Sequence, residues 1–226
     1  MTTRFRMRAC APDAVARICQ AHSMPGFMAR TLANRGIQTP EAVEAFLHPS
    51  LARDWLNPYD LPDMERIASQ LCQAIDDQQH IVVFGDFDLD GISATTVLTR
   101  GLRQMGARVT PFIPKRAEEG YGLTLAAFER LRPLGPDLII TVDCGIACKD
   151  EVAAIQEAGI QVIVTDHHEA GDLVPEGIPV CDPKAVPGHP SAVLAGVGVA
   201  LKVVQAVGGR RGYPHLWREY TDLATL

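Results

Sequence analysis

The hydrophobic positions of the chain follow two different periods. Up to about residue 75, apolar residues recur at helical spacing in several short segments. We predict helices over Ala11–Ala21, Arg30–Arg35, Pro40–Leu47 and Met64–Ile75, with Thr39 as the cap of the third helix. The stretch HPSLARDWLNPYDLPDM is rich in Pro, Asp and Asn, which favours a connecting loop.

Beyond residue 76, short apolar runs alternate with amphipathic segments. The apolar runs predict strands over Ile81–Gly85, Arg108–Ile113, Asp137–Val142, Gln161–Thr165 and Ile178–Cys181. The other segments predict helices over Ile92–Met105, Thr124–Leu131, Lys149–Ala158, Gly196–Val207 and Leu216–Leu226. Strands that are apolar throughout and alternate with helices are typical of an α/β fold, a parallel sheet with helices on both faces. We therefore expect two domains, a helical lead segment over residues 1–75 and an α/β domain over residues 76–226.

Charge is distributed unevenly along the 226 residues, whose net charge is −6. Residues 1–35 hold six arginines and one acid, Asp13, whereas residues 71–226 hold 13 basic and 20 acidic residues. The net charge therefore neither supports nor excludes a polyanionic substrate. No apolar run approaches the roughly 18 residues of a membrane span. The six cysteines show no zinc-type spacing, and we expect reduced thiols in a cytoplasmic protein.

Ionisable residues follow three of the predicted strands. GDFDLDG places Asp86, Asp88 and Asp90 after the first strand, TVDCG places Asp143 after the third, and TDHHE places His167 and His168 after the fourth. A single Asp at such a place is commonly a turn former or a helix cap, and one of two adjacent histidines is often a core residue. All three groups, however, fall at one edge of the sheet, the edge where α/β proteins bind ligands.

Clustered carboxylates raise each other's pKa values unless a cation is present, so this coincidence favours a metal site. Carboxylates with imidazole, and without a cysteine pattern, favour Mn²⁺ or Mg²⁺. Two such ions could support hydrolysis at phosphorus.

The three motifs, in this order and on these elements, resemble motifs one to three of the DHH phosphoesterase superfamily. The resemblance implies that Asp88, Asp90, Asp143 and His167 ligate two ions, with Asp143 as the bridging carboxylate. It also implies that Asp86 supports the ligands in the catalytic centre and that His168 is a catalytic or phosphate-contacting histidine.

Three further stretches resemble the RecJ-like exonucleases within that superfamily: PFIPKRAEEGYGL, LAGVGVALKV and RGIQTPEAVEAFLHP. The resemblance implies substrate contacts by Lys115, Arg116 and Tyr121, and by Gly196 and Gly198. Without the resemblance, Lys115 and Arg116 fit a solvated loop, and the two glycines fit close helix packing.

The resemblance implies an enzyme of DNA repair and recombination that removes nucleotides from single-stranded DNA in the 5′-to-3′ direction, with a single-strand-binding protein or a helicase as candidate partners. One alternative is another DHH phosphoesterase, acting on oligonucleotides, cyclic dinucleotides or polyphosphate; EEGYGL and the helical lead disfavour it. A second alternative is a non-catalytic nucleic-acid-binding scaffold, which the intact acidic motifs disfavour.

RecJ-like proteins continue beyond the helix that Tyr220–Leu226 resembles into a segment with another metal-binding Asp and then a second domain. Asp222 precedes the position of that ligand and is not assigned its role. We therefore expect this chain to be a fragment with an incomplete metal site and weakened or absent activity.

Overall fold

The computed structural model describes residues 8–225, and the chain forms two compact units that divide between Leu56 and Asn57. The sequence had placed this boundary at residue 75. The boundary differs because α4 (Met64–Asp76) packs against α9 (Gly196–Arg210) and so lies in the unit that contains the sheet.

The first unit contains three helices, α1 (Pro12–His22), α2 (Gly26–Asn34) and α3 (Pro40–Leu47). Thr39 caps α3 as predicted, since its side chain accepts a hydrogen bond of 3.2 Å from the Ala42 N–H. The prediction for α2 began four residues late, because Phe27 and Met28 are exposed and do not extend the hydrophobic period. The small core of this unit consists of Ile18, Ala29, Leu32, Ala33 and Val43.

The second unit is built on a five-stranded parallel sheet with the order β2-β1-β3-β4-β5. The strands are β1 (His80–Gly85), β2 (Arg108–Phe112), β3 (Leu138–Val142), β4 (Gln161–Thr165) and β5 (Val180–Cys181). Every residue of β1 and β3 is buried, as expected for central strands that are covered on both faces. Pro111, which has no N–H to donate, lies in the edge strand β2.

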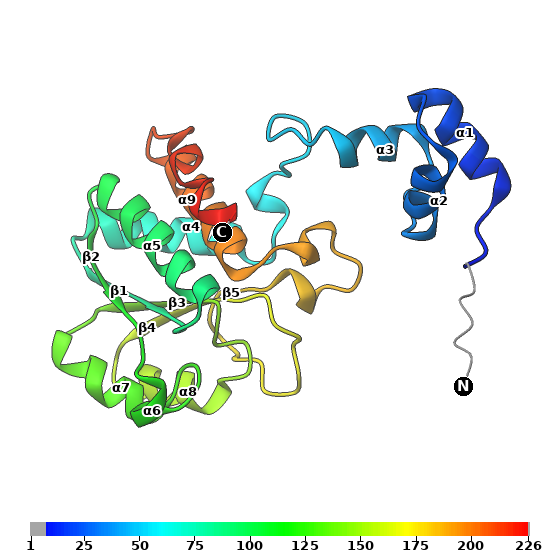
Figure 1. Ribbon diagram of the computed structural model, residues 1–226. Helices are drawn as coiled ribbons and strands as arrows, with labels where there is room; N and C mark the ends of the chain where they lie inside the picture. Colours follow the sequence, from blue (N-terminus) through cyan, green and yellow to red (C-terminus); the bar gives the residue numbers. More distant parts are fainter. Residues whose placement is uncertain (1–7, 226) are drawn as a thin grey trace, which may run out of the picture. The chain divides into compact units, whose positions relative to one another are not determined.

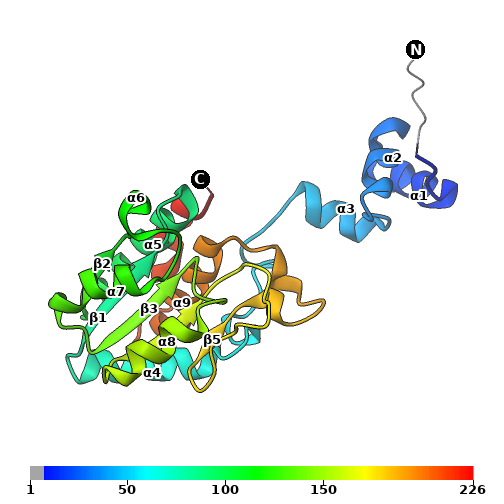
Figure 2. The same ribbon diagram turned by 90° about the horizontal axis from the view of Figure 1, so that it is seen from below.

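Helices cover both faces of this sheet, which confirms the predicted fold class. The bounds are α5 (Leu89–Gln104), α6 (Arg116–Glu119), α7 (Leu125–Leu131) and α8 (Lys149–Glu157). Figures 1 and 2 show α4, α5 and α9 on one face and α6, α7 and α8 on the other. Val82 and Phe84 of β1 share a buried core with Phe128 and Leu131 of α7. No helix within residues 8–225 combines the length and apolar character that a bilayer crossing requires.

The carboxyl-terminal part of the second unit differs from the prediction. Leu216–Leu226 was predicted to be one helix, but Leu216–Tyr220 and Leu223–Thr225 are two short 3₁₀ segments, and Leu226 lies outside the described residues. The buried residues Leu216, Trp217 and Tyr220 recur at a spacing that suits both helix types. A hydrophobic pattern alone therefore could not separate them.

The strand order reverses direction between β1 and β3. The chain leaves β1 for β2 on one side and returns to β3 on the other side of β1. In open α/β sheets such a switch point leaves a crevice beyond the carboxyl ends of the two strands, where ligands bind. The three predicted site motifs follow β1, β3 and β4, which are neighbours, so the sheet brings them to one place.

Two glycine substitutions test the close packing of α5 against α9. A Cβ on Gly101 of α5 would lie 2.7 Å from Cγ2 of Val204, whereas nothing lies within 4 Å of a Cβ on Gly209 of α9. We expect Gly101→Ala to lower the free energy of unfolding by about 1–3 kcal/mol through overpacking. Gly209→Ala should raise it by up to about 1 kcal/mol through helix propensity. Urea denaturation followed by circular dichroism measures both, and shifts of the same sign would contradict this packing.

Candidate metal centre

The turn after β1 places the first group of acids. Asp86 is buried directly after Gly85, and Asp88 caps α5 by accepting a hydrogen bond of 2.9 Å from the Gly91 N–H. The helix predicted to begin at Ile92 begins three residues earlier, at Leu89, so Asp90 lies in the first turn of α5. A Cβ on Gly91 would lie 2.5 Å from the Asp86 carbonyl oxygen. Gly91 therefore permits the close approach of the first turn of α5 to Asp86.

The turn after β3 places Asp143 beside this group. Asp143 is only 2% exposed and adopts a left-handed backbone conformation, with φ of +61°. Non-glycine residues in this region cost about 1–3 kcal/mol and cluster at functional sites. A Cβ on Gly196, at the start of α9, would lie 2.5 Å from Oδ1 of Asp143. The amino terminus of α9 thus packs directly on the Asp143 carboxylate.

The turn after β4 contributes both histidines. Nε2 of His167 lies 3.0 Å from Oδ1 of Asp143 and 3.4 Å from Oδ2 of Asp90. The rings of His167 and His168 are adjacent, with centroids 4.5 Å apart. Nδ1 of His168 lies 2.7 Å from Oδ1 of Asp166. A carboxylate can only accept a hydrogen bond, so in the neutral His168 imidazole the proton is on Nδ1 and Nε2 keeps its lone pair.

Within the described residues, two groups of side chains could each hold a cation, because their ligand atoms lie within 4.8 Å of one another. One group is Asp86, Asp88 and Asp143, and the other is Asp143, His167 and His168. Asp143 belongs to both. Oδ1 of Asp86 and Oδ1 of Asp143 are buried without a hydrogen-bond partner among the described residues, apart from the 3.0 Å contact of Asp143 with Nε2 of His167. Oxygen and imidazole ligands with unsatisfied buried oxygens fit Mn²⁺ or Mg²⁺.

The electrostatics of the site also fit a bound cation. Burial raises the pKa of Asp143 to about 6, and burial also raises the pKa of Asp86. Contact with Asp143 raises the pKa of His167, because the carboxylate stabilises the imidazolium. The two carboxyl shifts show that the protein stabilises these negative charges poorly. The His167 shift shows that the site favours a positive charge. A divalent cation would favour the ionised carboxylates and the neutral imidazole that serve as ligands.

Asp90 has a different role in the geometry. Its two carboxylate oxygens accept hydrogen bonds from the backbone N–H groups of Gly196 and Val197, at 2.8 and 2.7 Å. A carboxylate at a helix amino terminus is stabilised by the orphan N–H groups and the helix dipole. Asp90 thereby ties the start of α5 to the start of α9, and it belongs to neither of the two groups described above. Its assignment as a metal ligand stays a prediction.

The two glycines predicted to contact substrate lie in the first turn of α9. The N–H of Gly196 is engaged by Asp90, and a Cβ on Gly198 would lie 3.1 Å from the side chain of Leu194. Both positions are therefore explained by close packing, the structural alternative to a substrate contact. Their contact with substrate stays a prediction.

An aromatic and cationic cluster adjoins the acids. The ring of Phe87, between Asp86 and Asp88, meets Tyr121 edge to face with centroids 6.0 Å apart, and the guanidinium carbon of Arg116 lies 4.8 Å from the Phe87 centroid. Tyr121 is 59% exposed and so presents a ring to solvent. Arg116 begins the short helix α6, where the sequence had indicated a loop. Lys115 forms an exposed ion pair of 3.2 Å with Glu118. The structure thus brings Arg116 and Tyr121 to the site motif but gives no such contact for Lys115.

Two residues of the site were not identified from the sequence. Phe87 joins the first acidic motif to Arg116 and Tyr121. Asp166 accepts hydrogen bonds from the His168 ring at 2.7 Å, from the His167 N–H at 2.7 Å and from the Ile146 N–H at 2.9 Å. Asp166 thus orients His168 and fastens the turn after β4 to the turn after β3. The sequence offered one indication of a role for Asp166, because it is the first acid after β4.

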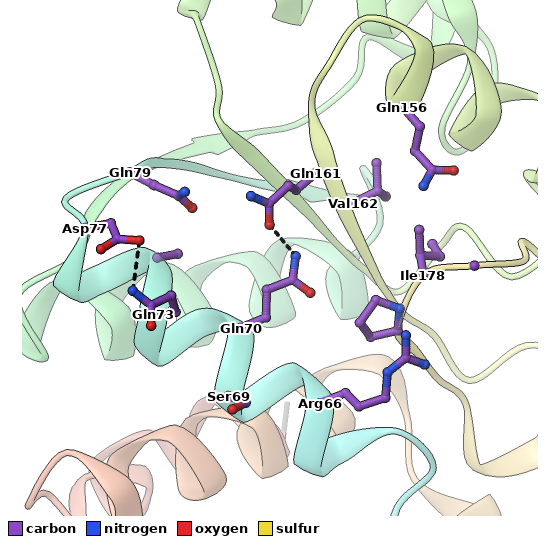
Figure 3. A pocket seen from close by; sticks show the side chains of 13 residues that line it. Arg66, Ser69, Gln70, Gln73, Asp77, Gln79, Gln156, Gln161, Val162 and Ile178 are labelled. Carbon is purple, nitrogen blue, oxygen red and sulfur yellow. Dashed lines mark hydrogen bonds between the residues drawn. The ribbon is translucent and has the colours of Figure 1, made fainter.

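A hollow of about 680 Å³ lies elsewhere in the second unit. Figure 3 shows its lining, in which Gln70 of α4 hydrogen-bonds to Gln161 at 2.7 Å. Gln161 is the first residue of β4, so this hollow lies near the amino end of the strand, away from the acids that follow the carboxyl ends. It contains none of the predicted site residues. Its lining of glutamines, with Arg66 and Asp77, lacks the clustered carboxylates and the histidines of the acidic site.

Comparisons with known proteins agree with the motifs. RecJ of Bacillus subtilis (strain 168), a single-stranded-DNA-specific exonuclease, is 40% identical over 209 residues, which cover 92% of this chain and 26% of that protein. RecJ of Thermus thermophilus is 39% identical over 193 residues, which cover 83% of this chain and 28% of that protein. The chain therefore spans little more than a quarter of the length of these relatives.

Solved structures give the same result. RecJ from Thermus thermophilus in complex with Mn²⁺ superposes with a TM-score of 0.76 at 33% identity, covering 96% of this chain and 30% of that one. An exonuclease RecJ bound to manganese gives a TM-score of 0.66 at 41% identity, covering 73% of this chain and 42% of that one. The resemblance to RecJ that the motifs indicated is thus confirmed. The model of the DHH family, N-terminal domain, matches residues 80–226, and this chain belongs to that family.

Proposed function

We propose that this chain is the metal-binding part of a metal-dependent exonuclease that hydrolyses single-stranded DNA from the 5′ end in DNA repair and recombination. The observation that carries the proposal is the position of Asp143, which belongs to both ligand groups at the switch point of the sheet. The similarity to RecJ proteins described above as single-strand-specific and manganese-bound supports the substrate and the ion.

Two ions, Mn²⁺ or Mg²⁺, would be held by Asp88, Asp90, Asp143 and His167, with Asp143 shared and Asp86 supporting them. When bound, such ions activate water and neutralise charge on the phosphate. The protein itself contributes His168, whose Nδ1 is held by Asp166 so that Nε2 can accept a proton and, once protonated, donate a hydrogen bond to a phosphate oxygen. Asp166 acts through His168 and is a positioning residue.

Arg116 and Tyr121 would hold the strand, and their contacts with Phe87 support this role. A guanidinium pairs with phosphate, and an exposed ring stacks on a base of any sequence. Lys115, Gly196 and Gly198 are retained as proposed substrate contacts on the resemblance alone. A single-strand-binding protein or a helicase is the proposed partner, and the cytoplasm the proposed location.

Manganese binding tests the metal centre without requiring turnover. We expect calorimetry to show Mn²⁺ binding that Asp143→Asn weakens by more than the roughly 10- to 100-fold that loss of an outer-shell partner costs. The reason is that Asn removes a charge shared by both groups. Asp150→Asn is the matched control, because Asp150 is an exposed acid in the first turn of α8. Equal weakening by both substitutions, or by neither, would refute the site.

The same binding should depend on pH. Asp143, whose pKa is raised to about 6, becomes protonated as the pH falls through 6, whereas His167, whose pKa is raised above the usual 6.5, becomes charged at a higher pH. Both changes oppose a cation, so the Mn²⁺ affinity should fall by about tenfold for each pH unit and each proton displaced. Calorimetry between pH 5 and 7.5 measures this fall, together with proton release in buffers of different ionisation enthalpy. An affinity that is independent of pH would contradict the assignment.

Hydrolysis tests the reaction itself. In the longest protein that carries this sequence, we expect Mn²⁺-dependent release of nucleotides from 5′-labelled single-stranded DNA, and Asp143→Ala should abolish it. Faster turnover of short oligonucleotides, cyclic dinucleotides or polyphosphate than of long strands would favour another DHH phosphoesterase. Strand binding without metal binding or hydrolysis would favour the scaffold.

A further inference from the structure

The solvent face of α2, in the first unit, differs from an ordinary polar helix surface. Phe27, Arg30, Thr31 and Asn34 recur at spacings of three and four residues, so they share one face of the helix. Phe27 is 73% exposed, although a Phe ring is commonly buried. The opposite face is the one that packs into the core of the unit, through Ala29, Leu32 and Ala33.

This face is hollowed. Arg8 joins the four residues of α2 around a depression of about 480 Å³, the α2 hollow, which is lined by Arg8, Phe27, Arg30, Thr31 and Asn34. The lining therefore combines two guanidinium groups, one aromatic ring, one hydroxyl and one amide, and it includes no acid. An apolar docking surface for a protein would instead be expected to have few charges at its centre.

The charges of the α2 hollow are available to a ligand. Within residues 8–225, neither Arg8 nor Arg30 takes part in an ion pair, whereas Arg53, in the same unit, pairs with Asp54 at 2.7 Å. The surrounding segment is basic, with six arginines and one acid in residues 1–35. Unpaired guanidinium groups on a basic segment attract a polyanion, and an exposed ring among them suits an unstacked base.

We propose that the α2 hollow binds single-stranded nucleic acid, with Phe27 stacked on a base and Arg8 and Arg30 on the flanking phosphates. A duplex keeps its bases stacked on each other, so the exposed ring favours a single strand. The choice of DNA rests on the proposed function; the binding itself rests on the residues of the α2 hollow. It would be a second contact for the strand, on a different unit from the metal centre.

The charge contact is tested with fluorescein-labelled oligothymidylate and the 226-residue chain in EDTA, where no metal-dependent hydrolysis occurs. Fluorescence anisotropy gives the affinity over a range of salt concentrations. Arg30→Ala should weaken binding and reduce the slope of log affinity against log salt by about 0.7, the value for one phosphate contact of a single strand. Arg17→Ala is the matched control, because Arg17 is an exposed arginine of α1 that does not line the α2 hollow. It should leave the slope nearly unchanged.

The stacking contact is tested at Phe27. We expect Phe27→Ala to weaken binding by about 5- to 100-fold, without a change in the salt slope, and Phe27→Tyr to restore it. Met28→Ala is the matched control, because Met28 is an exposed neighbour that does not line the α2 hollow. Neither Phe27 nor Met28 belongs to the core, so these variants should keep the fold of the unit.

Three results would overturn the inference: no binding of oligothymidylate by the unmodified chain, unchanged binding in Arg30→Ala and Phe27→Ala, or equal affinity for a duplex of the same length. Full binding in Phe27→Leu would also overturn the stacking contact, because leucine keeps the apolar surface but has no ring. Failure of the proposed function would appear separately, as absent metal binding or hydrolysis while the α2 hollow still binds the strand in EDTA.

Discussion

The candidate site depends on the close approach of α9 to the ends of β1 and β3. Gly196 allows this approach, because any side chain there would overlap the Asp143 carboxylate. Asp90 fixes it by accepting hydrogen bonds from the first N–H groups of α9. Burial of Asp143 follows from this packing, and its raised pKa follows from the burial. One packing constraint thus sets both the shape and the charge of the centre.

The features of this arrangement that cost free energy lie within the site itself. Asp143 adopts a left-handed backbone conformation, and the buried Oδ1 atoms of Asp86 and Asp143 have no hydrogen-bond partner among the described residues apart from the contact of Asp143 with His167. Such features cost free energy in the metal-free protein, and a bound cation would offset them. Asp166 limits the remaining freedom, since its carboxylate joins the turn after β4 to the turn after β3. Hydrogen bonds thus join the turns of the site, whereas its buried carboxylates lack groups that would stabilise their charge, as expected of a preorganised metal centre.

The two units differ in charge and in chemistry. The second unit concentrates carboxylates at one edge of a parallel sheet, a surface that by itself repels a polyanion. In the first unit, Arg8 and Arg30 form no ion pair with any residue of the described range 8–225, and α2 carries the exposed ring of Phe27. A substrate such as single-stranded DNA would need both kinds of surface, because the acids can act on phosphate only through a cation, whereas the guanidinium groups attract it directly.

The sequence by itself determined the fold class and the gathering of the three motifs. Continuous apolar strands such as Ile81–Gly85 predict a parallel sheet, and neighbouring parallel strands end at the same edge. It could not determine that Asp90 holds α9, that Asp166 accepts a hydrogen bond from the Ile146 N–H or that Phe87 contacts Arg116 and Tyr121, because these contacts join segments whose distance is set by packing. It also began α2 too late, because the exposed Phe27 breaks the hydrophobic period. Local patterns report which residues are buried, and only the tertiary structure decides which polar groups then meet.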